Sequence, residues 1–269
     1  MSSRVYLLVA LCFYTVGAIH ALAQALMRRR SSSSLPVIAA LAGLAAHTAG
    51  LSQRWTEAGH FPAVGLHDIT SFLAWAIVLA FLMTHIRSRV EALGLVVYPA
   101  AFSLLLVATM IPASERESPI LKSLFLPIHT TFAFLGYGAL FVAFAMGVLY
   151  LVQERELKGR SPQTFYYLLP SLEQCDSLAG RSVSIGIVFL SLAIVTGLLW
   201  NHAVHGYYWS GDAKQWSALV AWALYAALLY ARIRSGWGGR KAAFLGIAGF
   251  AAVVFIFVWI NVLSGGSYQ

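Results

Sequence analysis

The chain has 269 residues, of which 59% are hydrophobic and only 10% are charged, and its formal net charge is +8. A typical soluble domain carries roughly 25% charged residues, so this composition excludes an ordinary soluble protein and indicates a membrane protein. The positive charge is not a nucleic-acid signal, because its distribution along the chain is explained by membrane topology.

Apolar segments long enough to cross a membrane recur along the whole chain. A helix needs about 20 apolar residues to span the hydrocarbon core. We count eight such segments, at residues 5–27, 35–52, 67–86, 91–112, 126–153, 182–202, 216–233 and 241–263. They are continuously apolar rather than alternating, so helices are expected and a β-barrel is not. The sequence therefore predicts an all-α fold, a polytopic bundle of eight transmembrane helices in one integral membrane domain over residues 1–269.

The distribution of Lys and Arg predicts how these helices are oriented. If the N-terminus lies outside, thirteen of the 18 basic residues face the cytoplasm and only Arg4, Arg54, Arg116, Lys122 and Lys214 face out. This split follows the positive-inside rule with both termini extracytoplasmic. The first segment is predicted to be a retained helix rather than a cleaved signal peptide, because its apolar run is long and Arg28–Arg30 follow it directly. The expected location is the inner membrane of a bacterium.

The outer end of the sixth segment leads into an aromatic connection, residues 200–216. It contains three tryptophans, two tyrosines and two histidines within seventeen residues. Aromatic rings commonly lie at a membrane–water boundary. Imidazoles beside flat aromatic walls are less common there, and together they suit a large planar ligand that carries a metal.

The histidines are distributed unevenly across the predicted topology. His85 is expected at the cytoplasmic boundary and His20 within the first helix. His47 lies twelve residues beyond Leu35, roughly 18 Å from the cytoplasmic end of its helix and therefore in the outer half of the bilayer. Ionisable residues at such depth usually face the bundle interior. Five of the eight histidines are expected at the outer boundary, namely His60, His67, His129, His202 and His205.

Taken in order, these motifs resemble the cytochrome c assembly family of membrane proteins. Within it, the chain looks like the system II cytochrome c synthase channel subunit and the shorter YpjD- and HemX-like relatives. The resemblance covers nearly the whole chain. It is carried by His47, Arg54-Trp55, Gly59-His60, Pro62, Trp75, His129 with Gly136-Tyr137, the tryptophan-rich outer loop, Trp216, Trp222, Tyr225 and Gly236-Trp237-Gly238. The resemblance implies that haem is held at the outer membrane face between two axial histidines and over this loop, with His129 at the first axial position.

The chain also departs from the family pattern. Where the synthase loop typically reads Trp-Ser-Trp-Asp-Pro-Lys-Glu, this chain has Gly211 at the second tryptophan and Gln215 at the glutamate. Tyr230 stands where the family has an inner histidine, and residues 265–268, where its second outer axial histidine would fall, contain none. The large outer domain that delivers apocytochrome in the synthase is not among these residues. Full synthase activity is therefore not implied, and a part in a haem lyase system stays open.

Any haem is expected to be haem b, bound without covalent attachment, because the chain has no Cys-x-x-Cys-His motif. Cys12 is predicted inside the first helix and Cys175 in the third cytoplasmic loop, too far apart to pair. Zinc is a poor alternative, because the outer face has no cysteine and no His-Glu-x-x-His pattern.

Each candidate ligand has a structural alternative. A haem iron accepts neutral imidazole axially, and His129 is the leading candidate, against a boundary histidine that bonds loop carbonyls. His202 and His205 share a face if the helix persists there, so one could replace the missing ligand; the alternative is a solvated turn. His47 is read as the ligand of a second haem site or a proton-handling group, against a buried histidine bonded to a helix carbonyl.

The remaining candidates are less specific. Trp209 and Trp216 either stack on a porphyrin or anchor the loop at the interface. Asp212 either pairs with a neighbouring cation or, as favoured here, caps the seventh helix. For His60 and His67, capping and loop contacts are favoured over ligation, and Asp68 either orients an imidazole or caps the third helix.

Three functions are compatible with these residues. The first is a haem-handling membrane protein for cytochrome c biogenesis, whose partners would be haem, the lipid bilayer and apocytochrome c or another cytochrome-assembly membrane protein. The second is a haem-free accessory or scaffold protein of the same fold. The third and weakest is a small-solute transporter with His47 and His20 as a proton relay. No nucleic-acid partner is expected.

Overall fold

The structure is a computed structural model that describes residues 2–27, 34–62, 65–113, 123–159 and 168–258. Within these ranges it is all-helical, as the sequence predicts, with eight α-helices, one short 3-10 helix and no strand. The elements are α1 (Ser3–Met27), α2 (Leu35–Ala58), α3 (Gly65–Ser88), η1 (Glu91–Leu93), α4 (Gly94–Met110), α5 (Phe125–Lys158), α6 (Leu172–His205), α7 (Ala213–Ser235) and α8 (Gly239–Val258).

Seven helical segments in the described part of the chain are long and apolar enough to cross a membrane, namely α1, α2, α3, η1 together with α4, α5, α6 and α7. The chain is therefore a multi-pass membrane protein. The eighth predicted span corresponds to α8, which the structure describes as far as Val258, whereas the predicted segment continues to residue 263.

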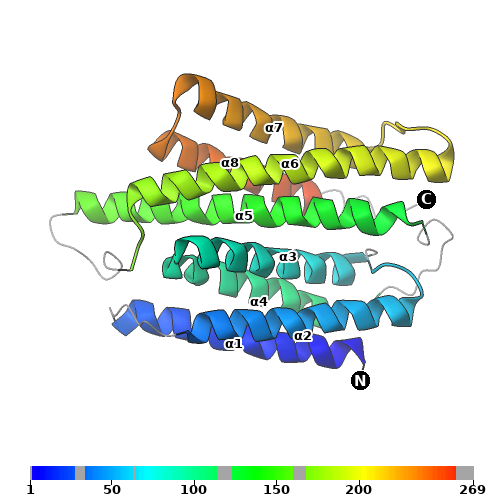
Figure 1. Cartoon of the computed structure of the whole chain (residues 1–269), viewed down its shortest axis with the longest axis horizontal. Helices are drawn as coiled ribbons and strands as arrows, with labels where there is room; N and C mark the ends of the chain where they lie inside the picture. The colour runs from blue at the N-terminus through cyan, green and yellow to red at the C-terminus, as the bar shows by residue number, and fades with distance from the viewer. Residues whose placement is uncertain (1, 28–33, 63–64, 114–122, 160–167, 259–269) are drawn as a thin grey trace.

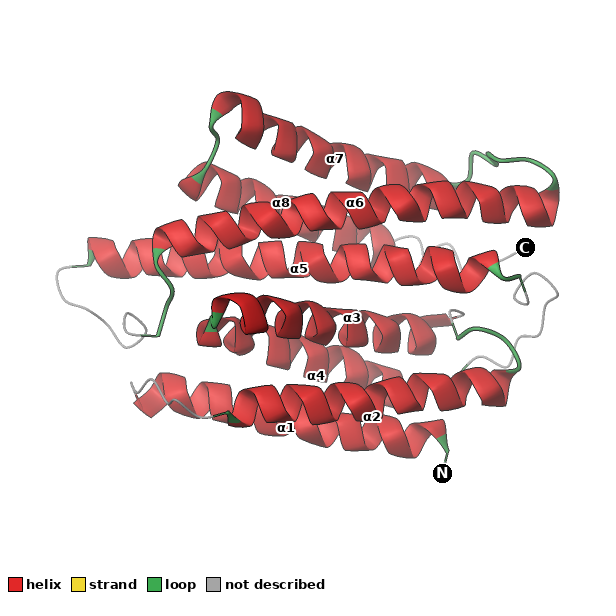
Figure 2. Ribbon diagram, in the orientation of Figure 1, coloured by secondary structure: helices red, strands yellow, loops and turns green. Residues whose placement is uncertain are grey.

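The helices lie roughly along a common axis and form two groups, α1–α4 and α5–α8 (Figure 1). In the first group α1 packs along α2 and α4, and in the second α5 packs along α6 and α8. The groups meet chiefly where α3 packs against α5 (Figure 2). At this contact Gly138 of α5 lies so close to α3 that an added Cβ would be 2.6 Å from the backbone oxygen of Ala76.

Two helices extend furthest beyond their predicted ends. α2 continues to Ala58, where Gly59 closes it in the left-handed conformation with its N–H donating to the Trp55 carbonyl. Arg54 and Trp55 follow the predicted segment 35–52 and were expected in the first outer loop; that expectation is wrong, because both are helical. α6 begins at Leu172, ten residues before the predicted segment, and Ser171 caps it by accepting from the Gln174 N–H. Both extensions are too polar for a membrane-span criterion but keep helical hydrogen bonding.

The same extension corrects the position of Cys175. It was predicted in the third cytoplasmic loop, but it lies in the first turns of α6 and is fully buried. Cys12 lies in α1, is exposed, and forms no disulfide with Cys175.

The polar run Glu154–Lys158 predicts an extension of the fifth helix, and the structure confirms it, since α5 ends at Lys158, whose Nζ lies 2.7 Å from the Glu154 carboxylate. The glycines of residues 235–240 predict a tight turn, which is also confirmed because α8 begins at Gly239. The sequence also predicts a turn at Ser161–Pro162 and a polar loop over residues 28–34; the turn and all of the loop but Ser34 lie outside the described residues.

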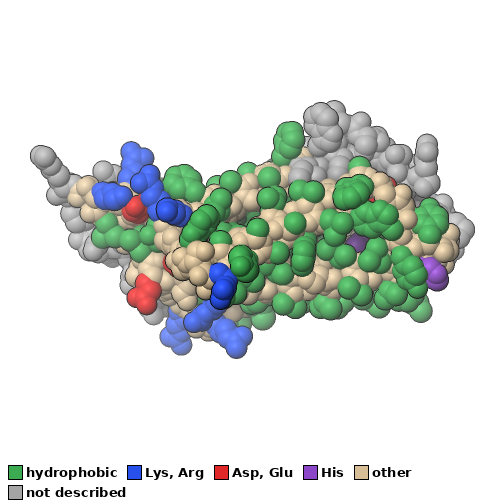
Figure 3. All heavy atoms as spheres, turned by 90° about the horizontal axis from the view of Figure 1, so that it is seen from above, with side chains coloured by type: hydrophobic (Ala, Val, Ile, Leu, Met, Phe, Trp, Pro, Cys, Tyr) green, Lys and Arg blue, Asp and Glu red, His purple; other side chains and the backbone are tan. Residues whose placement is uncertain are grey.

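The surface has the distribution that a membrane protein requires. Figure 3 shows one face on which hydrophobic side chains cover most of the length and the Lys and Arg side chains gather toward one end. This is the pattern that the positive-inside rule describes, and it identifies the basic end as the cytoplasmic one.

Candidate functional site

His129 lies in the first turns of α5 and its ring is bonded to α6. The His129 Nδ1 lies 2.8 Å from the carbonyl oxygen of Ala193. A carbonyl can only accept, so Nδ1 carries the proton and Nε2 keeps its lone pair. Nε2 makes no hydrogen bond among the described residues. An imidazole whose Nδ1–H is held by a backbone carbonyl is the usual form of a metal-ligating histidine.

Two further residues of α6 surround this ring. Trp200 stacks on it, with ring centroids 6.1 Å apart and planes inclined by 17°. Gly197 leaves the space that the ring occupies, because a Cβ there would lie 2.9 Å from both Cε1 and Nδ1 of His129. The sequence did not single out Gly197 or Ala193 as site residues, and Trp200 was noted only as one aromatic of the outer connection.

His202 and His205 lie on the last turn of α6. The helix therefore continues through both residues, which is the condition under which the two side chains lie on one face of it. Both are exposed, and each stacks on a loop tyrosine. The centroid distance is 4.2 Å from His202 to Tyr208 and 5.7 Å from His205 to Tyr207. Among the described residues neither histidine contacts His129, so the structure does not bring two histidines together there.

The tryptophans of the outer loop contact each other. Trp209 and Trp216 meet edge to face, with centroids 5.3 Å apart, and both are exposed. Asp212 is the N-cap of α7 and accepts from the Gln215 N–H at 2.8 Å, which confirms the predicted cap. In return, Gln215 Oε1 accepts from the backbone N–H groups of Ser210 and Gly211. In a capping box the second bond would come from the N–H of the cap residue itself. Here it comes from the two residues before Asp212, so Gln215 ties the end of the loop to the start of α7.

Two departures from the family pattern have local explanations. Gly211 has φ +72°, in the left-handed region, where a tryptophan would be strained. Gln215 supplies the side-chain oxygen that accepts from the Ser210 and Gly211 N–H groups, and a glutamate oxygen is an acceptor too. Tyr230 is 66% exposed, so this position faces away from the bundle interior in the described structure.

His47 is fully buried and both of its nitrogens have partners. Nδ1 lies 3.1 Å from the Tyr14 hydroxyl and Nε2 lies 3.0 Å from the Ser71 hydroxyl. One ring nitrogen donates and the other accepts, so this imidazole links α1, α2 and α3. As placed, it offers no nitrogen to a metal. The structural alternative predicted from the sequence is a buried histidine bonded to a helix carbonyl; the observed partners of His47 are instead two hydroxyl groups.

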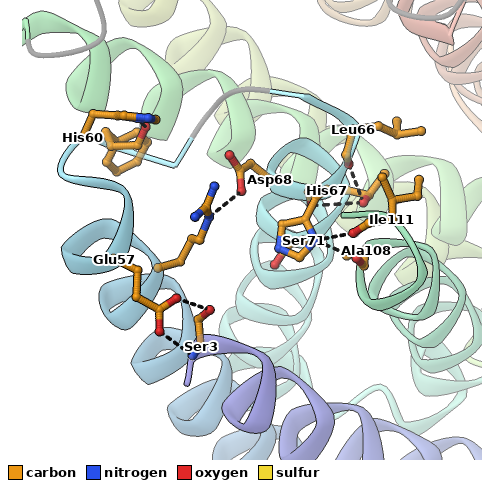
Figure 4. Close-up of polar contacts among 12 residues, drawn as sticks. Ser3, Glu57, His60, Leu66, His67, Asp68, Ser71, Ala108 and Ile111 are labelled. Carbon is orange, nitrogen blue, oxygen red and sulfur yellow. Dashed lines mark hydrogen bonds and ion pairs between the residues drawn. The ribbon is translucent and has the colours of Figure 1, made fainter. Parts of the chain in front are cut away.

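The other outer histidines contact nearby backbone (Figure 4). His60 Nδ1 lies 3.0 Å from the Phe61 oxygen, and His67 Nδ1 lies 2.6 Å from the Ala108 oxygen at the end of α4. Asp68, in the first turn of α3, lies 3.5 Å from the Arg54 guanidinium. His67 also lines a cleft of about 280 Å³ between the outer ends of α1, α2 and α4. His60 and His67 therefore make backbone contacts at loops and helix ends, which the sequence favours over metal ligation for these two residues.

The described residues offer little to the alternative chemistries. His20 Nδ1 is buried without a hydrogen-bond partner, so no hydrogen-bonded chain connects it to His47 there. No group of three or more His, Cys, Asp or Glu side chains gathers to hold a metal ion within the described ranges.

Comparison with known proteins gives consistent results. A family model described as "Cytochrome C assembly protein" matches residues 3–267. A "Cytochrome c biogenesis protein CcsA" from Microcystis aeruginosa is 31% identical over 268 residues, covering 81% of this chain and 82% of the relative. Its namesake from Prochlorococcus marinus strain AS9601 is 30% identical, covering 91% and 87%. A further CcsA, from Guillardia theta, is 28% identical and covers 81% and 79%.

Proposed function

Because the chain belongs to the cytochrome c assembly protein family, we propose that it is a haem-handling integral membrane protein of cytochrome c biogenesis. It binds or presents haem at the outer membrane face. The observation that supports this most directly is the state of His129, whose Nδ1 is committed to the Ala193 carbonyl while Nε2 is left for a ligand.

The residues around His129 fit a haem. The iron of haem b supplies an axial position that accepts a neutral imidazole nitrogen. Trp200 lies parallel to the His129 ring and its buried Nε1 has no hydrogen-bond partner among the described residues, so the site contains an unused donor as well as an unused ligand. His129 is therefore proposed as the ligating residue, and the outer end of the α5–α6 pair as its binding face.

The outer loop is proposed to complete the site. Trp209 and Trp216 are exposed and near one another, and they provide flat apolar surface for a porphyrin. His202 or His205 is proposed as the second axial ligand. Each would first have to leave the tyrosine on which it stacks. Asp212 would act indirectly by holding the loop at the start of α7.

The proposed location is the inner membrane of a bacterium. The proposed macromolecular partner is apocytochrome c or another cytochrome-assembly membrane protein. Haem would be cargo held reversibly and passed on, since no Cys-x-x-Cys-His motif is present in the sequence to retain it covalently.

An absorbance spectrum of the detergent-purified protein tests the proposal. We expect a Soret band as purified or after addition of haemin, and we expect His129→Ala to weaken haem binding at least about tenfold, or 1.4 kcal/mol. His85→Ala is the matched control, because His85 lies in the last turn of α3, at the cytoplasmic side of the membrane and away from His129. A well-folded protein that stays colourless and takes up no haemin would overturn the proposal.

The absence of a contact between His129 and any other histidine in the described ranges favours one alternative, a haem-free scaffold. Under this alternative His129→Ala would leave cytochrome c production intact, whereas changes at the cytoplasmic helix ends would abolish it. A complementation assay that scores both classes of variant separates the two functions.

A further inference from the structure

The ring of His129 is held by one face of α6. Ala193, Gly197 and Trp200 are spaced as i, i+4 and i+7, so their side chains lie along a single stripe of the helix. In chain order they provide a hydrogen-bond acceptor, a gap and a flat wall for the same imidazole.

We propose that Gly197 and Trp200 are positioning residues that fix the plane of the His129 imidazole and thereby the direction of its Nε2 lone pair. The consequence for haem rests on the proposed function, whereas the contacts themselves exist without haem. Neither residue ligates the iron. They act through His129, by limiting how its ring turns about the bond that carries it.

Gly197 is explained by the imidazole alone. The three nearest atoms to a Cβ at this position are Cε1, Nδ1 and Cγ of His129, at 2.9, 2.9 and 3.7 Å. Gly197 does not have positive φ, so the backbone itself does not require glycine. Helix interiors also disfavour glycine relative to alanine. The described surroundings therefore give one reason for glycine here, which is to make room for the His129 ring.

Trp200 acts through its ring rather than its N–H. The Trp200 indole lies at 17° to the imidazole, and its Nε1 has no hydrogen-bond partner among the described residues. The Trp200 side chain also packs against Leu126 at the start of α5. A flat wall on one side and the Ala193 carbonyl at Nδ1 leave the imidazole one orientation.

The first experiment needs no haem. Gly197→Ala is introduced into the parent and into the His129→Ala variant, and thermal unfolding of the purified proteins is compared. We expect Gly197→Ala to lower the melting temperature of the parent. In His129→Ala it should be neutral or raise the melting temperature, because the atoms it would meet are gone. Gly246→Ala is the matched control, since a Cβ there would meet nothing within 4 Å. Equal destabilisation by Gly197→Ala in both backgrounds would overturn the assignment of Gly197.

The second experiment measures the bound haem. Trp200→Phe keeps a flat ring, whereas Trp200→Leu does not. We expect Gly197→Ala and Trp200→Leu to weaken haemin binding about tenfold, as loss of a supporting contact does at other metal ligands. They should also shift the electron paramagnetic resonance of the ferric haem, because those signals follow the orientation of the axial imidazole. Trp200→Phe should restore both properties.

The outcomes separate the two proposals. A parent protein that binds no haem defeats the proposed function, while the double-mutant comparison still decides the contacts around His129. Unchanged affinity and an unchanged spectrum in Gly197→Ala and Trp200→Leu would overturn the positioning role. So would a reduced yield of folded protein whose bound haem has the parent spectrum, since that is the signature of a purely structural role.

Discussion

Arg232 of α7 forms a bidentate pair with Asp176 of α6, in which Nη1 donates to Oδ1 at 3.1 Å and Nη2 donates to Oδ2 at 3.0 Å. Nη2 also donates to the backbone oxygen of Asp176 at 2.9 Å, and Asp176 Oδ1 accepts from the Gly239 N–H at the start of α8. One carboxylate thus ties together the cytoplasmic ends of three helices. This cluster fixes the cytoplasmic end of α7, the helix whose other end follows the outer loop.

Removal of the Arg232–Asp176 pair is expected to destabilise the second group of helices, α5–α8. Arg232→Ala leaves the half-buried Asp176 carboxylate with only the Gly239 N–H as its partner. Hydrogen bonds to charged groups contribute roughly 1.5–3 kcal/mol, so we expect a loss of about 2 kcal/mol in unfolding free energy. Thermal unfolding of the purified protein measures it. Arg234→Ala is the control, because Arg234 is exposed on the same turn; equal losses in the two variants would contradict the assigned role.

The buried hydrogen bonds of His47 predict non-additive effects. His47→Ala leaves the Tyr14 and Ser71 hydroxyls without their imidazole partner inside the bundle. An unsatisfied buried polar group costs about 1–3 kcal/mol, and removal of the ring adds a cavity. Tyr14→Phe added to His47→Ala should therefore cost less than it does in the parent.

A double-mutant cycle on unfolding free energies provides the measurement. Thr56→Ala serves as the control, since Thr56 is exposed and bonds only within its own helix. Strictly additive losses for His47→Ala and Tyr14→Phe would show that the bond between them contributes little. Retention of normal stability in His47→Ala would remove the structural role given to this histidine.

The fold class could be predicted because it depends on local information. The length of each apolar run decides whether a helix can span a membrane, and this length can be counted directly in the sequence. The helix ends were less predictable. Arg54 and Glu57 on α2 and the residues from Leu172 on α6 are too polar for a membrane-span criterion, yet glycine or serine caps beyond them set the real boundaries.

His129 is the leading candidate ligand through its motif, and this stays a prediction. The residues that contact its ring could not be identified in advance, because Gly197 becomes informative only once His129 is known to face it. The partners of His47 lie 33 and 24 residues away in sequence, on other helices, so no local pattern indicated that both of its nitrogens are occupied. The signal that was available for Gly197 was an isolated glycine inside a helical segment, which often marks a packing requirement.

The cap on α7 gives a prediction that separates geometry from charge. Asp212→Asn keeps an oxygen that accepts from the Gln215 N–H, whereas Asp212→Ala removes it. Loss of an N-cap typically costs about 1 kcal/mol, so Asp212→Ala should loosen the first turn of α7 and Asp212→Asn should not. Hydrogen exchange at the Gln215 amide provides the measurement. If the asparagine variant exchanges as fast as the alanine variant, the carboxylate charge rather than the cap is what matters.

The close approach of α5 to α3 predicts that Gly138 tolerates no side chain. A Cβ there would lie 2.6 Å from the backbone oxygen of Ala76 and 2.9 Å from its backbone carbon. Backbone atoms cannot turn aside as a side chain can, so the two helices would have to move apart. Overpacking typically costs about 1–3 kcal/mol, and alanine regains roughly 1 kcal/mol of helix propensity, which leaves a net loss of up to about 2 kcal/mol for Gly138→Ala.

Because this contact joins the two groups of helices, the loss should appear as a lower melting temperature of the purified protein. Gly246→Ala is the matched control, since it makes the same change at a helical position with open space. That control should melt at or slightly above the parent temperature, as helix propensity alone requires. A Gly138→Ala protein that behaves like the Gly246→Ala protein would show that α3 and α5 are not in close contact, and the two groups would then have to be joined by other residues.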